Sequence, residues 1–217
     1  MTGHRPPPGS RHRRRVLGVV AVAGAAQLGA SLASPPDSRR FYALTTGVAA
    51  TWVAGGLVTG PVPWTGEDDH PHRTLVRAVA VGVGAFLAFY AAALVARKVP
   101  FLRHALAGVL RYAHHGRTPT VLATVWGNGA AEEVFFRGAL YDAFADEHPI
   151  VTSTAAYALV TCVTRNPALA LASIPMGALF AWQRQTTGGI EVPVVTHLTW
   201  STLMTWLLPP LFHGSSR

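Results

Sequence analysis

Long apolar stretches separated by short polar connections are the feature that most constrains the fold of this 217-residue chain. About 20 apolar residues are enough to cross the hydrocarbon core of a bilayer as a helix. Only 13% of the residues are charged and 50% are hydrophobic, whereas soluble domains average about 25% charged residues. The sequence therefore predicts an all-α fold, a multi-pass transmembrane helical bundle.

About seven hydrophobic helices are expected in this bundle. They cover residues 16–33, 41–59, 75–96, 120–144, 150–163, 168–182 and 190–208. Residues 1–15, rich in arginine and proline, are expected to be a disordered tail. Residues 97–119 carry several arginines around a short apolar patch, which indicates an amphipathic helix on the membrane surface. The chain thus divides into the tail, an N-terminal helical part (16–119) and a core (120–212).

The formal net charge of +8 has a membrane explanation. The basic residues gather in the tail and in connections between apolar stretches, where they would meet anionic lipid headgroups. Membrane lipids are therefore expected partners, and nucleic acid is not. The basic tail predicts a cytoplasmic N-terminus. Three spans separate the tail from the equally basic residues 97–119, which would put these two segments on opposite sides of the membrane, so the orientation of residues 97–119 stays open. Cys162 is the only cysteine, so the chain cannot form an intramolecular disulfide.

A group of charges interrupts the apolar stretch 120–144. Each ionised side chain at bilayer depth costs on the order of 2.5–3.5 kcal/mol on insertion scales, so such residues usually pair and serve a function. On a helix, Glu133 and Arg137 share a face at i,i+4 and are predicted to pair. Glu132 points elsewhere and is predicted to act as a general base. Asn128, one turn earlier, is a candidate to orient that carboxylate.

A second polar pair lies near the C-terminus, where His197 and Ser201 share a helix face at i,i+4. Brought opposite Glu132, they would supply donors that stabilise a developing oxyanion, as peptide hydrolysis requires. Structural alternatives exist for both groups. Glu133 and Arg137 would serve as a buried ion pair without a chemical role, and His197 as a hydrogen bond between helices.

The spacing of these residues resembles that of CAAX-processing and bacteriocin-processing (CPBP) intramembrane endopeptidases, a group that includes the Rce1-type prenyl proteases. The resemblance covers about residues 120–208. Its three motifs read Glu132-Glu133-x-x-x-Arg137, Tyr157-x-x-x-Thr161 and His197-x-x-x-Ser201.

The resemblance implies a role for each motif. In that family the leading glutamate and a second-motif histidine are thought to activate water, while a histidine and an asparagine of the third motif stabilise the oxyanion. Those roles fall here on Glu132 and His197. The chain departs from the pattern twice, because Thr161 stands at the position of the second-motif histidine and Ser201 at that of the asparagine. Tyr157 matches the aromatic residue of the second motif.

The function expected from the sequence is a glutamate-dependent endopeptidase of the bacterial plasma membrane, acting on a peptide or protein near that membrane. No cofactor or metal is expected, because no His-Glu-x-x-His motif occurs and the proposed site offers too few zinc ligands. Two alternatives remain open. One is a catalytically degenerate relative that acts as a scaffold or immunity-type binding protein, and the other is a small proton-coupled transporter.

Overall fold

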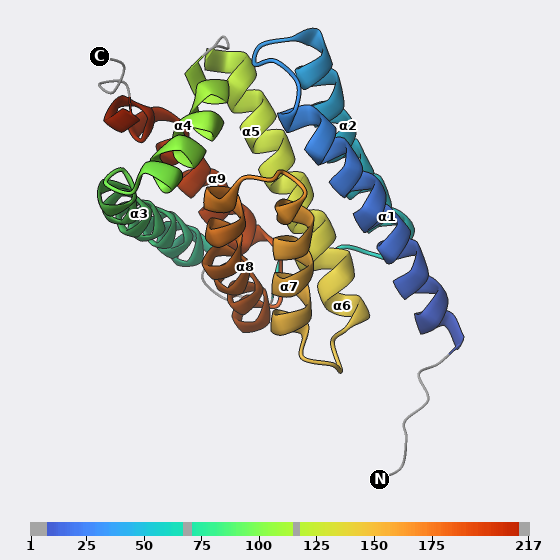
Figure 1. Ribbon diagram of the computed structural model, residues 1–217. Coiled ribbons are helices and arrows are strands. Elements are labelled where there is room, and N and C mark those ends of the chain that lie inside the picture. The colour runs from blue at the N-terminus through green and yellow to red at the C-terminus, as the bar shows by residue number, and fades with distance from the viewer. Residues whose placement is uncertain (1–7, 67–70, 115–117, 213–217) are drawn as a thin grey trace.

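All regular secondary structure in the described residues, 8–66, 71–114 and 118–212 of the computed structural model, is helical. The helices are α1 (Pro8–Leu32), α2 (Arg39–Val58), α3 (Pro71–Ala96), α4 (Pro100–His114), α5 (Thr118–Glu133), α6 (Tyr141–Ala143), α7 (Pro149–Cys162), α8 (Pro167–Thr187) and α9 (Glu191–Leu207). A π-helical segment, η1 (Val134–Leu140), joins α5 to α6, and a 3-10 turn, η2 (Pro209–Phe212), follows α9 (Figure 1). The predicted all-α class is therefore confirmed.

Within the described residues, three helices are long and apolar enough to cross a membrane. These spans are Arg11–Leu32, Arg39–Val58 and His72–Ala96, of 22, 20 and 25 residues. At about 1.5 Å per residue, each covers roughly the 30 Å of a hydrocarbon core. The predicted count of about seven hydrophobic helices is not confirmed. With α5, η1 and α6 taken as one continuous helix, the described ranges hold eight helices, and α7 is a shorter apolar helix.

The continuous helix α5–η1–α6 runs through the middle of the bundle (Figure 1). The α1–α2 hairpin packs on one side of it, where α2 contacts both α5 and η1. On the other side lie the paired helices α7 and α8, together with α9, which packs against α3 and α5. Four elements from distant parts of the sequence therefore converge on the end of α5.

The start of the first helix and the end of α8 differ from the sequence prediction. The first helix begins at Pro8, so the arginines expected in a disordered tail are helical from residue 8 onward, and residues 1–7 lie outside the described ranges. Arg13 donates a hydrogen bond to the carbonyl of Ala139 (3.2 Å), and Arg14 donates one to that of Ala143 (3.0 Å). These contacts give the basic turn the partners that a free tail would lack.

The second difference is at the end of α8, which was expected to end at residue 182 and is helical up to Thr187. Gln183 donates to the Thr196 hydroxyl at 2.8 Å, and Arg184 forms an ion pair with Asp142 at 2.9 Å. These polar residues face neighbouring helices, so they belong to the bundle. The helix then ends at Gly188, whose φ of +76° places it in the left-handed region that favours glycine.

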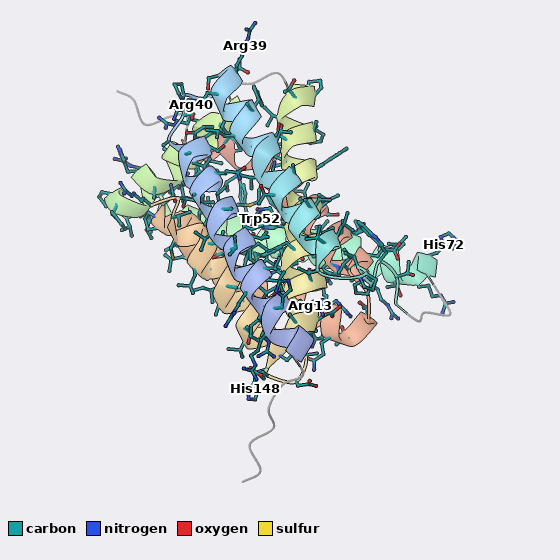
Figure 2. The ribbon with its side chains drawn as sticks, turned by 90° about the vertical axis from the view of Figure 1, so that its right-hand side faces the viewer. Arg13, Arg39, Arg40, Trp52, His72 and His148 are labelled. Carbon is teal, nitrogen blue, oxygen red and sulfur yellow. The ribbon has the colours of Figure 1, made fainter. Side chains whose placement is uncertain are left out.

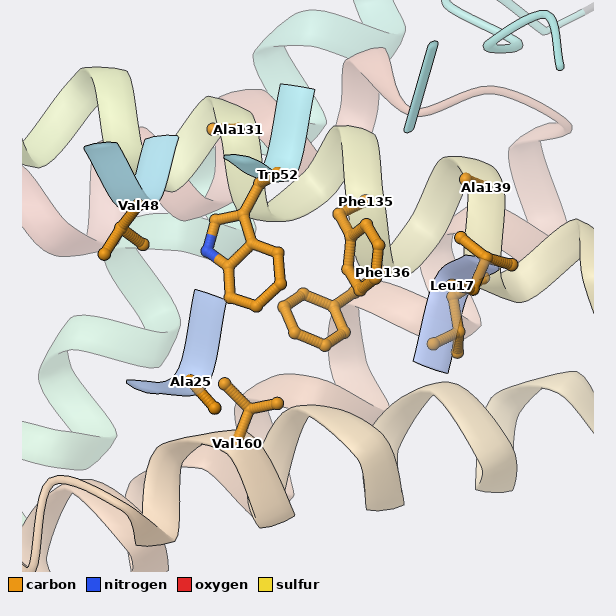
Figure 3. Packing of buried hydrophobic residues seen from close by; sticks show 10 residues of the cluster. Leu17, Ala25, Val48, Trp52, Ala131, Phe135, Phe136, Ala139 and Val160 are labelled. Atoms are coloured by element: carbon orange, nitrogen blue, oxygen red, sulfur yellow. The ribbon is translucent and has the colours of Figure 1, made fainter. Parts of the chain in front are cut away.

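The largest apolar cluster joins the α1–α2 hairpin to the central helix (Figure 3). Trp52, 1% exposed, lies with its ring centroid 4.7 Å from that of Phe135 and 5.3 Å from that of Phe136. Gly24 of α1 makes this possible, because a Cβ at that position would overlap the Trp52 ring.

Figure 2 shows Arg39 and Arg40 at the opposite end of the bundle from Arg13.

Candidate active site

The predicted pair of Glu133 and Arg137 forms inside the bundle. Both residues are fully buried, and Arg137 Nη1 lies 3.4 Å from Glu133 Oε1. That distance is longer than the 2.7–2.9 Å typical of charge-assisted hydrogen bonds. Arg137 also donates through Nη2 to the carbonyl oxygen of Gly177 at 3.1 Å. The guanidinium carbon lies 4.6 Å from the centroid of the Tyr157 ring and 5.2 Å from that of Phe180. These contacts allow a guanidinium to remain buried at this depth.

The turn that follows the two glutamates is π-helical, which the sequence did not predict. A π-helical turn contains one more residue than an α-helical turn and often occurs at functional sites. Side chains from three other helices bind its outward carbonyl oxygens. Ser153 Oγ of α7 donates to Phe136 O at 2.8 Å, Arg184 Nε of α8 to Arg137 O at 3.1 Å, and Arg13 of α1 to Ala139 O. The wide turn is thus fixed by tertiary contacts.

His197 lies between the two glutamates. Its Nδ1 is 2.8 Å from Glu133 Oε1, and its Nε2 is 4.0 Å from Glu132 Oε2. The imidazole stacks on Phe180 of α8, with ring centroids 4.7 Å apart and planes inclined by 18°. Because Glu133 is the counter-ion of Arg137, we assign the hydrogen between Nδ1 and Glu133 to the histidine. Nε2 is then the ring nitrogen that faces Glu132.

Glu132 has a second neighbour from α7. The hydroxyl group of Tyr157 donates a hydrogen bond to Glu132 Oε2 at 2.9 Å. This is the same oxygen that faces His197 Nε2. The Glu132 side chain is 18% exposed, whereas that of Glu133 is completely buried. The two carboxylates therefore differ in their surroundings: Glu133 is enclosed by Arg137 and His197, and Glu132 lies at the more open side of the cluster.

The comparison with known families concerns this part of the chain. Residues 114–203 match the family model described as type II CAAX prenyl endopeptidase Rce1-like. The C-terminal part of the chain is therefore similar to the Rce1-like family. Neither a curated protein nor a solved structure matches the chain. Because the Rce1-like family is a protease family, the chain is a candidate peptidase.

Three other predicted site residues point along their own helices. Thr161, at the position of the second-motif histidine, donates its hydroxyl proton to Tyr157 O at 2.8 Å. Ser201 Oγ donates to His197 O at 2.8 Å, and Asn128 Nδ2 donates to Thr124 O at 2.9 Å. In this conformation their donors are satisfied by backbone carbonyl groups one turn earlier. The expected orientation of Glu132 by Asn128 is not seen, and Tyr157 makes that contact instead.

An apolar cavity of about 910 Å³ adjoins the cluster of Glu132, Glu133 and His197. Its walls come from α3, α4, α5, α8 and α9, and include Thr124, Trp200 and Ser201. Ser201 lies one helical turn beyond His197, and Thr124 lies one turn before Asn128. The cavity therefore reaches to within one turn of the charged cluster from the α4 side of the bundle.

The contact that sequence reasoning missed most clearly is the one between His197 and Glu133. Sixty-four positions separate these residues, and helix periodicity gives no information about such a pair. The spacing predicted only that Glu133 and His197 each share a face with a residue four positions away. In the described residues, no three His, Cys, Asp or Glu side chains converge so as to hold a metal ion.

Proposed function

We propose that this chain is a membrane endopeptidase that hydrolyses a peptide bond close to the bilayer, with Glu132 as the general base. The observation that carries this proposal is the position of Glu132 Oε2, 4.0 Å from His197 Nε2. A base and an oxyanion donor must both lie within hydrogen-bond reach of one reacting group, directly or through one water. At this separation the carboxylate and the imidazole can both reach one substrate carbonyl group and the water that attacks it.

The reaction uses the asymmetry of the two glutamates. Glu132 takes a proton from water as the water oxygen bonds to the substrate carbonyl carbon. The carbonyl oxygen becomes an oxyanion, which accepts a hydrogen bond from Nε2–H of a protonated His197. Glu133 holds that imidazolium through Nδ1–H. When the C–N bond breaks, Glu132 returns the proton to the leaving amine, so the carboxylate is restored.

The site carries equal numbers of both charges in this state. Glu132 and Glu133 contribute two negative charges, and Arg137 with a protonated His197 contributes two positive ones. Since an unbalanced charge is costly in a buried site, the neutral total supports the assignment of a protonated histidine. Glu133 and Arg137 act by holding His197, and neither touches the substrate.

The test uses purified protein in liposomes with a set of fluorescence-quenched, lipid-anchored peptides. We expect cleavage by the unaltered protein and a loss of at least 100-fold in Glu132→Gln, whose fold should persist because the amide keeps the shape of the side chain. Glu147→Gln is the matched control, since its carboxylate pairs with Arg14 at the far end of the bundle and its side chain is 55% exposed. Full activity in Glu132→Gln would refute the proposed base.

A second function is favoured by the two departures from the family pattern. The hydroxyl groups of Thr161 and Ser201 both point to backbone carbonyl groups of their own helices. A catalytically degenerate scaffold or immunity-type binding protein would need neither group at the reaction centre. A scaffold or binding protein would capture a protein partner equally well in the unaltered form and as Glu132→Gln. Neither the unaltered protein nor Glu132→Gln would then cleave a peptide.

We propose the bacterial plasma membrane as the location, with a cytoplasmic N-terminus. Arg11 and Arg15 flank the first span on its N-terminal side and are exposed. Arg13 and Arg14 lie in the same turns. Positive charges next to the first span favour its cytoplasmic side. In this orientation the opposite end of the bundle, which holds Arg39 and Arg40, faces outward (Figure 2).

A further inference from the structure

We propose that Tyr157 is the residue that positions Glu132 for reaction, through the hydrogen bond from its hydroxyl group to Glu132 Oε2. This inference rests on the proposed endopeptidase function. The resemblance to the family leads one to expect a second-motif side chain at position 161 beside Glu132, and the structure assigns that place to the residue four positions earlier.

The Tyr157 ring is held on several sides. Its centroid lies 5.1 Å from that of Phe136 in an edge-to-face arrangement, and the Arg137 guanidinium lies over the ring at 4.6 Å. On the α8 side, Gly177 leaves room for the ring, since a Cβ there would lie 3.3 Å from Tyr157 Cδ1. These contacts restrict the ring, so the hydroxyl group approaches Glu132 from a fixed direction.

The helix that carries Tyr157 is itself fixed against the central helix. Ser153 lies one turn before Tyr157 on the same face of α7 and is fully buried. It donates to Phe136 O at 2.8 Å, while Tyr157 donates to Glu132 Oε2 at 2.9 Å. Two hydrogen bonds one turn apart thus set the register of α7 against α5 and η1. Thr161, one turn further, uses its donor within α7.

The chemical consequence is an orientation of the carboxylate. With Oε2 held by the phenol, Oε1 is the oxygen that takes the proton from water and later gives it to the leaving amine. Tyr157 keeps its own proton throughout, because a phenol is a much weaker acid than an imidazolium. The partner of Glu132 therefore does not change its protonation near neutral pH, as a histidine at position 161 would.

The experiment compares three variants in the liposome assay: Tyr157→Phe, the double variant Tyr157→Phe with Thr161→His, and Tyr42→Phe. The last makes the same chemical change at a hydroxyl group that binds Asp37, far from the site. We expect Tyr157→Phe to lower kcat about 10- to 100-fold, with KM within about twofold, because hydrogen bonds to charged groups are worth about that factor. Tyr42→Phe should match the unaltered protein.

The double variant adds a readout that a merely structural role would not move. We expect it to recover part of kcat and to gain an acidic limb in its pH profile, because the new imidazole becomes protonated as the pH falls. The unfolding temperature of each variant separates a folding defect from a loss of activity. Ser153→Ala is added because it removes the neighbouring hydrogen bond to Phe136 O. Ser153→Ala should unfold at a lower temperature while its pH profile keeps its shape.

Each result decides between the possibilities. If Tyr157→Phe keeps its kcat within about twofold, or loses activity only as much as its stability falls, the positioning role is overturned. If the unaltered protein is inactive and the double variant is active, Tyr157 does not position Glu132 for reaction. The endopeptidase site formed by Glu132 and His197 would still be supported. If every protein is inactive, or Glu132→Gln is fully active, the endopeptidase function falls and the role of Tyr157 falls with it.

Discussion

The substitution Glu133→Gln tests the charge balance of the buried cluster. It keeps the shape of the side chain and removes the charge that faces Arg137 and His197. Removing one partner of a buried ion pair costs about 3–5 kcal/mol, because the other charge is left uncompensated. Arg137 keeps its hydrogen bond to Gly177 O and its contact with the Tyr157 ring, and such cation–π contacts are worth about 0.5–2 kcal/mol. We therefore expect a loss of about 2–4 kcal/mol in the free energy of unfolding.

Thermal unfolding in detergent micelles measures this loss. At about 2–4 °C per kcal/mol for a chain of this size, Tm should fall by about 5–15 °C. The matched control is Glu147→Gln, which breaks a half-exposed ion pair with Arg14 that is worth about 0–1 kcal/mol. Adding Arg137→Met to Glu133→Gln should recover part of the loss, since it removes the unpaired cation. If Glu133→Gln lowers Tm no more than Glu147→Gln does, Glu133 is not the counter-ion that this reasoning requires.

Two further predictions concern packing and orientation. Trp52→Ala should lower the free energy of unfolding by about 3–5 kcal/mol, because it opens a cavity between the α1–α2 hairpin and the central helix. A decrease in Tm of less than about 2 °C would contradict the role of the Trp52 ring in holding these elements together. Cys162 is exposed, and its neighbour Val163 lies against Gly29 near the C-terminal end of α1. With a cytoplasmic N-terminus, this end of α1 lies on the outer side of the membrane. A membrane-impermeant maleimide should therefore label Cys162 from outside intact cells. Glu147→Cys in a Cys162→Ser background should label only after lysis, and the reverse pattern would overturn the cytoplasmic N-terminus.

Local spacing was enough to predict part of the site. The i,i+4 relation of Glu133 to Arg137 depends only on helix periodicity, and the pair forms even though the turn between them is π-helical. The same rule places His197 and Ser201 on one face, yet Ser201 uses its hydroxyl group on the carbonyl of His197 itself. Ser and Thr hydroxyl groups often make this bond inside helices. Thr161 follows the same pattern, so shared faces did not guarantee shared contacts.

Contacts between distant helices could not be predicted from spacing. The hydrogen bond between Tyr157 and Glu132 joins residues 25 positions apart, and that between Arg184 and Arg137 O joins residues 47 apart. Both depend on how α7 and α8 pack against the central helix. The extension of α8 through Gln183 and Arg184 has the same origin, since polar residues read as a turn found partners on α9 and α6.

The sequence by itself determined that the chain is helical and apolar, and that Glu133 would lie beside Arg137 while Glu132 would point elsewhere. Those properties follow from composition and from periodicity within one helix, which are local. Only the tertiary structure decided which carboxylate the histidine binds, and which hydroxyl group reaches Glu132. His197 contacts Glu133 at 2.8 Å and faces Glu132 at 4.0 Å. The reason is physical: these distances depend on the packing of α5, η1, α7, α8 and α9, and helix periodicity carries no information about neighbours from other helices.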